Sequence, residues 1–395
     1  DVIEVEAVDG TTQNITITIT GTNDTAVISG DVSGSVVEDV NVSNDVISTS
    51  GTLSVSDIDS GESLFTAETI SGSYGSLVID EDGNWSYSAD NTQSAIQSLG
   101  VGDTLSETIE VESIDGTTQN ITITITGTND VAQITGDITG SITEDVSVSD
   151  DVISTSGSLN VTDADSGEAL FTAETISGSY GNLTIDQNGD WSYSADNTQS
   201  AIQSLGQGDQ ITDVIEVESI DGTTQNITIT ITGTNDVAQI TGDITGSITE
   251  DSNVSDDVIS TSGSLAISDV DSGEALFSAE TITGSYGSLV ISEDGNWSYS
   301  ADNSQSAIQS LGQGDQITDV IEVESIDGTT QNITITITGT NDTAVISGDV
   351  SGSVVEDVSV SDDVISTSGS LNVTDVDSGE SLFTAETISG SYGSL

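Results

Sequence analysis

Six amino acids are absent from this sequence of 395 residues: lysine, arginine, histidine, cysteine, proline and methionine. Without cationic side chains, the chain lacks the basic surface with which proteins bind nucleic acid or anionic membranes. Without histidine or lysine, no serine has a side-chain base to activate it, and a Walker-type phosphate loop has no lysine. The absence of cysteine excludes a disulfide framework. These absences argue against an enzyme and against a nucleic-acid partner.

Long apolar runs and aromatic residues are also scarce. No apolar run approaches the roughly 20 residues that a membrane-spanning helix needs, so we expect no direct membrane insertion of this segment. Aromatic residues make up 4% of the chain, and acidic chains with few aromatics are often disordered. Hydrophobic residues, however, make up 33% and alternate regularly with polar ones, so we expect folded domains instead.

Acidic residues are present in excess. The 68 Asp and Glu residues give a formal net charge of −68. Eighteen of them lie in residues 25–130, and at a mean spacing of about 20 Å in unscreened water they would repel by at most about 30 kcal/mol. A domain is stable by only about 5–15 kcal/mol. Salt screens the distant pairs, but neighbouring carboxylates need a countercharge that this chain does not supply.

The sequence repeats itself every 106 residues. The tetrapeptide Gly-Thr-Asn-Asp closes each copy, and it stands at Gly21–Asp24, Gly127–Asp130, Gly233–Asp236 and Gly339–Asp342. A tryptophan keeps the same spacing at Trp85, Trp191 and Trp297. Each copy is therefore one structural unit. We expect three whole copies, residues 25–130, 131–236 and 237–342, between the last strands of one copy at 1–24 and the first part of another at 343–395.

One copy consists largely of short segments with β-prone or alternating composition. In the first copy they are Val27–Gly30, Ser35–Val37, Thr52–Ser56, Leu64–Ile70, Ser76–Ile79, Asn84–Ser88, Glu107–Ile114 and Thr117–Thr126. Asn41–Ser50 is polar and predicts a loop. Asp90–Leu99 is the one segment that resembles a helix, with Asp90 or Asn91 as its N-cap. Asp82-Gly83 is typical of a type I′ hairpin turn.

Seven or eight strands in about 100 residues predict an all-β fold of tandem antiparallel β-sandwich domains, immunoglobulin-like or cadherin-like. Alternation in the last strand places Ile121, Ile123 and Ile125 in the core and the intervening threonines outside. Trp85 and Tyr87 are expected at the core and its rim rather than on a ligand-binding surface.

Three groups of neighbouring oxygen-bearing side chains recur in every copy at strand ends or loops. In the first copy they are Asn23 with Asp24, Glu38 with Asp39, and Asp57 with Asp59 and Glu62. A sandwich can gather such loops at one pole, next to the incoming linker. Oxygen ligands without histidine or cysteine favour Ca²⁺ over zinc or copper, and flexible loops suit it better than Mg²⁺. Acidic loops are often merely solvated, but the lack of any other countercharge favours calcium as the cofactor.

The repeated motifs together resemble the VCBS repeat. They are Gly-Thr-Asn-Asp-x-Ala-x-Ile, the following Glu-Asp, Val-x-Asp-x-Asp-Ser-Gly-Glu, Ser-Tyr-Gly-x-Leu, Asp-Gly-Asn-Trp-Ser-Tyr and Asp-Gly-Thr-Thr-Gln-Asn-Ile-Thr-Ile. That family occurs in very large secreted bacterial surface proteins, including RTX-type adhesins exported by type I systems. The resemblance implies cadherin-like sandwiches in tandem, acting as a stalk, with Ca²⁺ near the domain boundaries.

Similarity to cadherin junctions implies the ligands in each copy. The strongest candidates are Asn23, Asp24, Glu38, Asp57 and Asp59, with Asp39 and Glu62 as further ones. The equivalent residues are Asn129, Asp130, Glu144, Asp145, Asp163, Asp165 and Glu168; Asn235, Asp236, Glu250, Asp251, Asp269, Asp271 and Glu274; and Asn341, Asp342, Glu356, Asp357, Asp375, Asp377 and Glu380.

The sequence therefore predicts an extender segment of a giant bacterial surface adhesin, extracellular and stiffened by calcium, whose partners are its neighbouring repeats. Its final adhesion target would lie outside this segment. One alternative is a repeated carbohydrate- or surface-binding module, which would need exposed aromatics on one face. Another is self-association into a filament or matrix. The motif at Asp59–Gly61 matches that of aspartic proteases, but it recurs in every copy beside further carboxylates, and a calcium-binding turn explains it better.

Overall fold

The computed structural model describes residues 1–358 and 360–395. These residues form two compact units whose boundary crosses the middle copy. The first unit comprises Asp1–Ser141, Ser154–Ala195 and Thr212–Thr230, and the second comprises Ile142–Ile153, Asp196–Ile211 and Ile231–Leu395. Within the residues described, no helix is long and apolar enough to cross a membrane.

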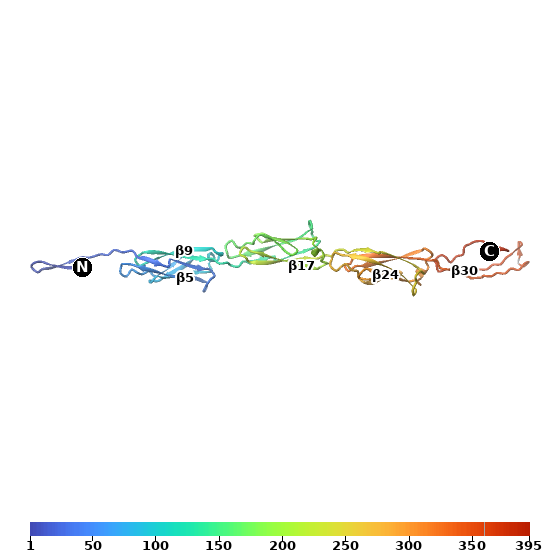
Figure 1. The fold of residues 1–395 in the computed structure, drawn as a ribbon, viewed down its shortest axis with the longest axis horizontal. Coiled ribbons are helices and arrows are strands. Elements are labelled where there is room, and N and C mark those ends of the chain that lie inside the picture. The colour runs from blue at the N-terminus through green and yellow to red at the C-terminus, as the bar shows by residue number, and fades with distance from the viewer. Residues whose placement is uncertain (359) are drawn as a thin grey trace. The chain divides into compact units, whose positions relative to one another are not determined.

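The first whole copy is a two-layered β-sandwich (Figure 1). Its elements are β3 (Val27–Gly30), β4 (Ser33–Val37), β5 (Val46–Ser56), β6 (Glu68–Ser71), β7 (Gly75–Ile79), β8 (Asn84–Asp90), α1 (Ser94–Gln97), β9 (Thr104–Glu112) and β10 (Thr118–Thr126). One sheet has the order β3-β5-β8-β7-β6, and the other has the order β4-β10-β9. The pairs are antiparallel except β4 and β10, which run parallel. The predicted all-β sandwich is confirmed, with this one parallel pair added.

The core lies between the two sheets because alternate side chains of each strand point inward. Ile121, Ile123 and Ile125 of β10 are 0% exposed, as their alternation with threonine predicts. Trp85 and Tyr87 of β8 are also buried, so both belong to the core. At Gly51 an added Cβ would lie 2.4 Å from Trp85 Cζ2, so only glycine leaves room for the indole ring.

The middle and third copies repeat these elements at the same offsets. The middle copy has β11 (Gln133–Gly136), β12 (Thr139–Thr143), β13 (Val152–Thr162), β14 (Glu174–Ser177), β15 (Gly181–Ile185), β16 (Asp190–Asp196), α2 (Ser200–Gln203), β17 (Gln210–Glu218) and β18 (Thr224–Thr232). The third has β19 (Gln239–Gly242), β20 (Thr245–Thr249), β21 (Val258–Ser268), β22 (Glu280–Thr283), β23 (Gly287–Ile291), β24 (Asn296–Asp302), α3 (Ser306–Gln309), β25 (Gln316–Glu324) and β26 (Thr330–Thr338).

The described strands of the flanking segments pair with strands of the same segment. β1 (Val2–Glu6) pairs with β2 (Thr12–Thr16), β27 (Val345–Gly348) with β30 (Leu371–Thr374), and β28 (Val360–Ser361) with β29 (Val364–Ile365). Ile15 is 49% exposed, whereas its equivalent Ile121 is 0% exposed. The same strand sequence is therefore buried only where the opposing sheet is present.

Several local expectations were wrong. Asn41–Ser50 was expected to be a loop, but β5 begins at Val46 and pairs with β8 from Val46 to Thr52. Most of its outward residues are serines, so its composition resembles a loop although its backbone pairs with β8 and then with β3. The expected strand Leu64–Ile70 is shortened to β6, and Phe65 forms only an isolated bridge to Ser113.

The helix and the hairpin turn also differ from expectation. α1 is confined to four residues, and its N-cap is Gln93 without a side-chain cap bond, so neither Asp90 nor Asn91 is the cap. Asp90 Oδ1 instead accepts a hydrogen bond from the Thr92 backbone N–H at 2.9 Å. In the β7–β8 turn the central glycine, Gly83, has a positive φ of 85° but Asp82 does not. A type I′ turn needs positive φ at both positions, so this turn is of another type.

One buried carboxylate in each copy ties the β6–β7 loop to the opposite sheet. In the middle copy this residue is Asp213, which accepts hydrogen bonds from the Tyr193 hydroxyl (2.9 Å) and from the backbone N–H groups of Ser179 (2.8 Å), Tyr180 (3.0 Å) and Gly181 (3.2 Å). Asp319 does the same in the third copy, and Glu107 takes this place in the first. These interior carboxylates therefore have donors in place of a countercharge.

Candidate metal centre

The linker Gly-Thr-Asn-Asp is held between side chains of two consecutive copies, a region we call the joint. At the first joint, the Thr128 N–H donates to Glu38 Oε1 of the same copy at 2.9 Å. Two residues later, the Asp130 N–H donates to Asp165 Oδ2 of the next copy at 2.9 Å. Asp165 is held in turn, because its N–H donates to Asp163 Oδ1 at 2.9 Å. Carboxylates from both copies thus converge on the linker.

The other two joints have the same hydrogen bonds. Thr234 and Thr340 donate to Glu144 and Glu250 at 2.9 and 2.8 Å, and Asp236 and Asp342 donate to Asp271 and Asp377 at 2.8 and 2.9 Å. At the start of the chain, the Asp24 N–H donates to Asp59 Oδ2 at 2.8 Å. The arrangement follows from the repeat and occurs at each linker.

Carboxylate oxygens at the joints are buried without a hydrogen-bond partner. At the first joint, these oxygens are Glu38 Oε2, Asp130 Oδ2, Asp163 Oδ2 and Asp165 Oδ1. The second and third joints add Glu144 Oε2, Asp269 Oδ2, Asp271 Oδ1, Glu250 Oε2, Asp342 Oδ2 and Asp377 Oδ1, and the first copy adds Asp57 Oδ2. A buried charged oxygen without a donor is costly. Because the chain has no cationic side chain, these oxygens fit a divalent cation that prefers oxygen ligands.

The pKa values of several joint carboxyls are raised, as expected for negative charges without a countercharge. Burial raises the pKa of Glu38 to about 7, and the charges of Asp130 and Asp39 add to the shift. Burial also raises the pKa of Glu144 to about 7, with Asp145 and Asp236 as the neighbouring charges. For Asp130, burial and then the charge of Asp39 raise the pKa of its carboxyl. Like charges are held together here without compensation.

The carboxylates of a joint do not form a closed group. Among residues 1–358 and 360–395, no three acidic side chains stand together as a ready-made metal-binding cluster. They are linked in pairs through the linker backbone instead. The carboxylate oxygens that are buried without a donor are the feature of the joint that fits a divalent cation.

The predicted ligands differ in how far they enter the joint. The asparagines of the linker are exposed, and the Asn129 amide donates to the carbonyl of Asp130 at 3.0 Å, as in the other linkers. Glu168 is half-buried and touches the preceding copy: a Cβ added at Gly100 would lie 2.6 Å from Glu168 Oε1. Glu356 and Asp357 are exposed. Glutamate and aspartate side chains therefore contribute to the joints more than the asparagines do.

Two features of the joint were missed in the sequence. Asp103 closes the turn before β9, and its charge contributes to the raised pKa of Glu168, after burial and the charges of Asp165, Asp163 and Asp221. The Ser166 N–H also donates to the Ser98 carbonyl of the preceding copy at 3.1 Å. The recurrence of Asp103 as Asp209 and Asp315 was the available signal. The backbone contact carries no sequence signal.

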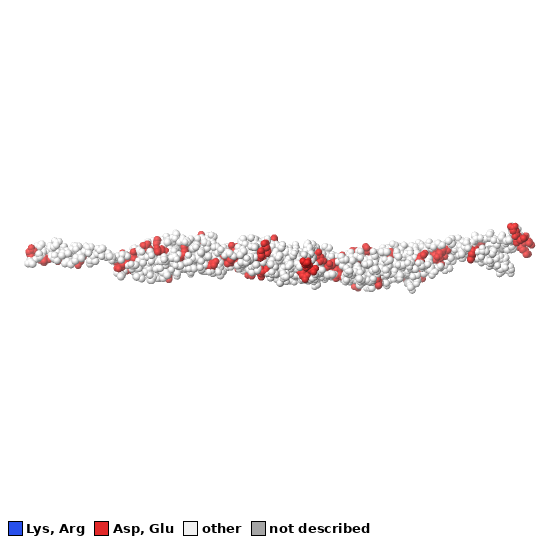
Figure 2. Space-filling view, turned by 90° about the horizontal axis from the view of Figure 1, so that it is seen from above, with Lys and Arg blue, Asp and Glu red and all other residues white. Residues whose placement is uncertain are grey.

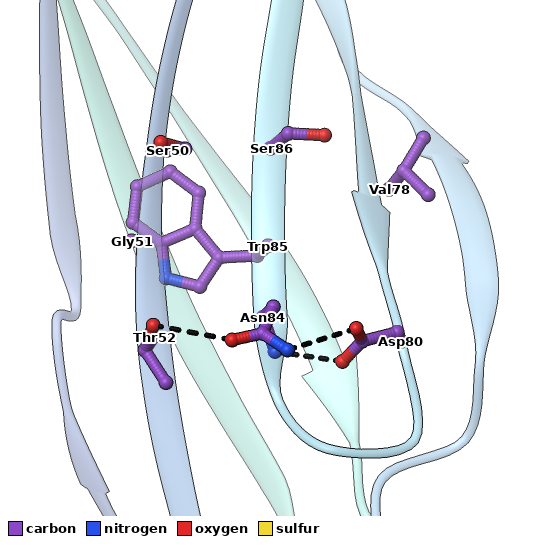
Figure 3. A pocket seen from close by; sticks show the side chains of 8 residues that line it. All are labelled: Ser50, Gly51, Thr52, Val78, Asp80, Asn84, Trp85 and Ser86. Atoms are coloured by element: carbon purple, nitrogen blue, oxygen red, sulfur yellow. Dashed lines mark hydrogen bonds between the residues drawn. The ribbon is translucent and has the colours of Figure 1, made fainter.

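The surface shown in Figure 2 carries acidic side chains as its only charges. A shallow hollow on the outer face of the larger sheet is lined by polar side chains, including Thr52, Asp80 and Asn84 (Figure 3). The Asn84 amide donates to Asp80 Oδ2 at 2.9 Å and accepts from the Thr52 hydroxyl at 3.4 Å. Trp85 lines the hollow but is 2% exposed, so no aromatic face is available there for stacking on a sugar.

Sandwich domains in tandem with acidic joints define a class of cadherin-like repeat proteins. A family model described as the bacterial cadherin-like domain matches residues 23–127, 129–233 and 235–339. The three matches cover most of the chain, which therefore belongs to the bacterial cadherin-like domain family and holds three tandem copies of its domain. No curated protein matches the sequence.

Solved structures of low sequence identity are similar to this chain over most of its length. The EC3-6 segment of protocadherin gammaB7, from a cis-dimer structure, is 14% identical, with 83% of this chain and 76% of that chain covered and a TM-score of 0.43. The EC22-24 segment of mouse cadherin-23 is 14% identical, with 81% and 100% covered and a TM-score of 0.42. Titin domains I67-I69 are 10% identical, with 80% and 99% covered and a TM-score of 0.32.

Proposed function

We propose that this chain is an extracellular extender whose copies are joined by calcium, and that it projects an adhesive region of a larger bacterial surface protein. The work of such a segment is mechanical rather than catalytic. The proposal includes three whole VCBS-like copies, at residues 25–130, 131–236 and 237–342. The larger protein would be an RTX-type adhesin that serves attachment or biofilm formation. Membership of the bacterial cadherin-like family supports the extender role.

The buried carboxylate oxygens without donors are the single observation that carries the calcium proposal. At the first joint, Glu38, Asp130, Asp163 and Asp165 would hold the ion, with Asp39 beside them. Calcium accepts six to eight oxygen ligands in flexible geometry, which suits carboxylates drawn from separate loops. A cation bound there would neutralise charges from two copies at once. It would therefore favour the folded domains and restrict bending between them.

Unfolding of the full chain in 10 mM Ca²⁺ and in EGTA tests this function. A site with a Kd of about 0.1 mM contributes about 2.7 kcal/mol at a hundredfold excess of calcium. For a domain of about 100 residues, this corresponds to an increase in melting temperature of roughly 10–20 °C. Small-angle scattering of the same samples should give a larger radius of gyration with calcium, because the joints stiffen.

Matched variants locate the effect at the joints. Replacing Asp165, Asp271 and Asp377 by asparagine should abolish most of the calcium effect. Asp190→Asn is the control, because the other whole copies carry Asn84 and Asn296 at that position. If EGTA changes neither the melting temperature nor the scattering of the unmodified chain, the proposed function is wrong.

A further inference from the structure

Asp39 has a backbone conformation that needs support. It follows Glu38 at the end of β4, and its φ is +56°, in the left-handed region that costs free energy for a residue with a side chain. Asp145 and Asp251 have φ values of +55° and +56° at the same place in the next copies. The recurrence shows that each copy holds this residue in one defined conformation.

The side-chain amides of Asn91, which precedes α1, and of Gln97, which ends α1, hold the Asp39 carboxylate. Asn91 Nδ2 donates to Asp39 Oδ1 at 2.6 Å, and Asn91 Oδ1 accepts the Asp39 N–H at 3.3 Å. Gln97 Nε2 donates to the same Oδ1 at 3.2 Å. Asn91 is 6% exposed, so its amide is sheltered from competing water. Both donors use one oxygen of Asp39, and the Asp39 carboxylate lies beside the Asp130 carboxyl of the joint.

The same contacts recur in the other whole copies. The Asn197 and Gln203 amides donate to Asp145 Oδ1 at 2.6 and 3.1 Å, and the Asn303 and Gln309 amides donate to Asp251 Oδ1 at 2.7 and 3.1 Å. The asparagine lies 52 residues and the glutamine 58 residues after the aspartate. Such long-range contacts are unlike the solvated acidic loop that sequence composition alone suggests.

The other end of this segment touches the following copy. The Ser98 carbonyl accepts the Ser166 N–H at 3.1 Å, and the equivalent pairs Ser204–Ser272 and Ser310–Ser378 are 3.1 and 3.0 Å apart. Gly100 comes next, and the Glu168 carboxylate packs where a Cβ of residue 100 would lie. Residues 91–100 therefore contact Asp39 through two side-chain amides, and they contact the following copy through Ser98 and Gly100.

We propose that residues 91–100, and their equivalents 197–206 and 303–312, couple cation binding to the docking of the next copy. Asn91 and Gln97 act as positioning residues: they orient the Asp39 carboxylate toward the ion, and ion binding in turn fixes the segment whose Ser98 carbonyl holds Ser166. This inference rests on the proposed function, because it assigns the residues that transmit calcium binding across the joint. Partners that orient a metal ligand typically change metal affinity by about 10–100-fold when they are removed.

Substitution of the glutamines in the full chain tests whether these amides affect cation binding. Gln97, Gln203 and Gln309 are replaced together by alanine, and calcium affinity is measured by isothermal titration calorimetry. We expect affinity to fall by about 10-fold, while the melting temperature in EGTA stays unchanged. The control replaces Gln119, Gln225 and Gln331, whose amides donate to the carbonyl of the following residue. Equal affinity in the variant and the control would overturn the inference.

A second variant guards against a purely structural effect. Asn91, Asn197 and Asn303 are replaced by alanine, which removes the donor to Asp39 without adding a charge to the joint. A structural role would lower the melting temperature equally with and without calcium. The positioning role lowers calcium affinity by more than the glutamine variant does, so the melting temperature falls further in calcium than in EGTA. An equal loss in both conditions counts against the inference.

Amide hydrogen exchange of Ser166, Ser272 and Ser378 tests whether cation binding affects the contact with the next copy. In the unmodified chain, calcium should slow exchange of these N–H groups at least several-fold, because they donate across the joint. At saturating calcium, the glutamine variant should exchange these amides faster than the control does, although its sites are filled. Equal protection in both proteins would overturn the coupling. No calcium binding by the unmodified chain would instead refute the proposed function itself.

Discussion

Asp213 and Glu144 are both acidic, both buried and both in the middle copy, yet their surroundings differ. Asp213 is 1% exposed and accepts four hydrogen bonds from three backbone N–H groups and a tyrosine hydroxyl. Glu144 is 0% exposed and accepts one, from Thr234, while its second oxygen has no donor. The first lies inside a domain and the second at a joint. Burial is the same, but only one carboxylate is satisfied by the fold.

The pKa values of the two carboxyls shift in opposite directions for this reason. Burial opposes ionisation of Asp213, but the N–H groups of Tyr180 and Ser179 and the Tyr193 hydroxyl outweigh it and lower the pKa. Burial raises the pKa of Glu144 to about 7, and neighbouring aspartates reinforce the shift. The comparison teaches that the fold supplies donors wherever a carboxylate serves the domain itself. At the joints, by contrast, carboxylate oxygens are buried without a donor, which is the observation on which the calcium proposal rests.

The largest expected effect in this comparison comes from Asp213→Asn. The amide loses the charge that three N–H groups and one hydroxyl point at, and hydrogen bonds to charged groups contribute about 1.5–3 kcal/mol. We expect the middle domain to lose about 2 kcal/mol, equally in calcium and in EGTA, measured by urea unfolding. A loss seen only in calcium would mean that Asp213 serves the joint, and the distinction drawn above would fail.

Glu144→Gln should act in the opposite direction in EGTA. Its carbonyl oxygen can still accept the Thr234 N–H, and its NH₂ group can donate to neighbouring aspartates, so repulsion in the joint decreases. We expect a gain of up to about 1 kcal/mol without calcium and a loss of most of the calcium-dependent stabilisation. Parallel urea titrations in EGTA and in calcium measure both. A variant destabilised in EGTA would show that the glutamate is already satisfied.

The pH dependence should be a smaller effect of the same kind. Because the folded-state pKa of Glu38 and Glu144 is about 7 against an ordinary 4.5, the folded chain binds protons more tightly than the unfolded chain. Stability in EGTA should therefore fall as pH rises from 4.5 through 7. Calcium binds the ionised form, so in calcium the trend should disappear or reverse. Melting temperatures at pH 5 and 7.5 test this, and a rise with pH in EGTA would contradict it.

The smallest effect is expected at the hairpin turn of the larger sheet. Asn188 of the middle copy corresponds to Asp82 and Asp294, and all three precede a glycine of positive φ. Backbone geometry rather than charge decides this position, so Asn188→Asp should change stability by less than about 0.5 kcal/mol in either condition. Urea unfolding measures it. A larger change would show that charge matters away from the joints as well.

Much of the fold could be predicted from local pattern. The period of 106 residues and the alternation of Ile121, Ile123 and Ile125 with threonine predict repeated sandwich domains, because a period of two exposes one strand face to a core. β5 was partly missed because its outward positions are serines, which are also common in loops. The helical segment was overextended because its buried Ile96 and Leu99 fit a helix as well as a short turn.

The sequence indicated which acidic residues belong to the candidate site, but it did not indicate the amides that contact them. Glu38, Asp163 and Asp165 recur in the sequence as acidic groups, and the structure brings them to the linker. Asn91 and Gln97 gave no signal, since amides in a polar segment are ordinary. Their function depends on contacts 52 and 58 residues away along the chain.

The sequence by itself determines that this protein is a series of acidic all-β repeats without any internal countercharge, because period, alternation and composition are local properties. Tertiary structure alone decided which carboxylates obtain donors and which do not. It also decided that β4 joins β10 in parallel and that Asn91 reaches Asp39. The physical reason is that hydrogen-bond satisfaction of a buried charge depends on groups distant in sequence, whose approach is set by the packing of two sheets and by the next copy along the chain.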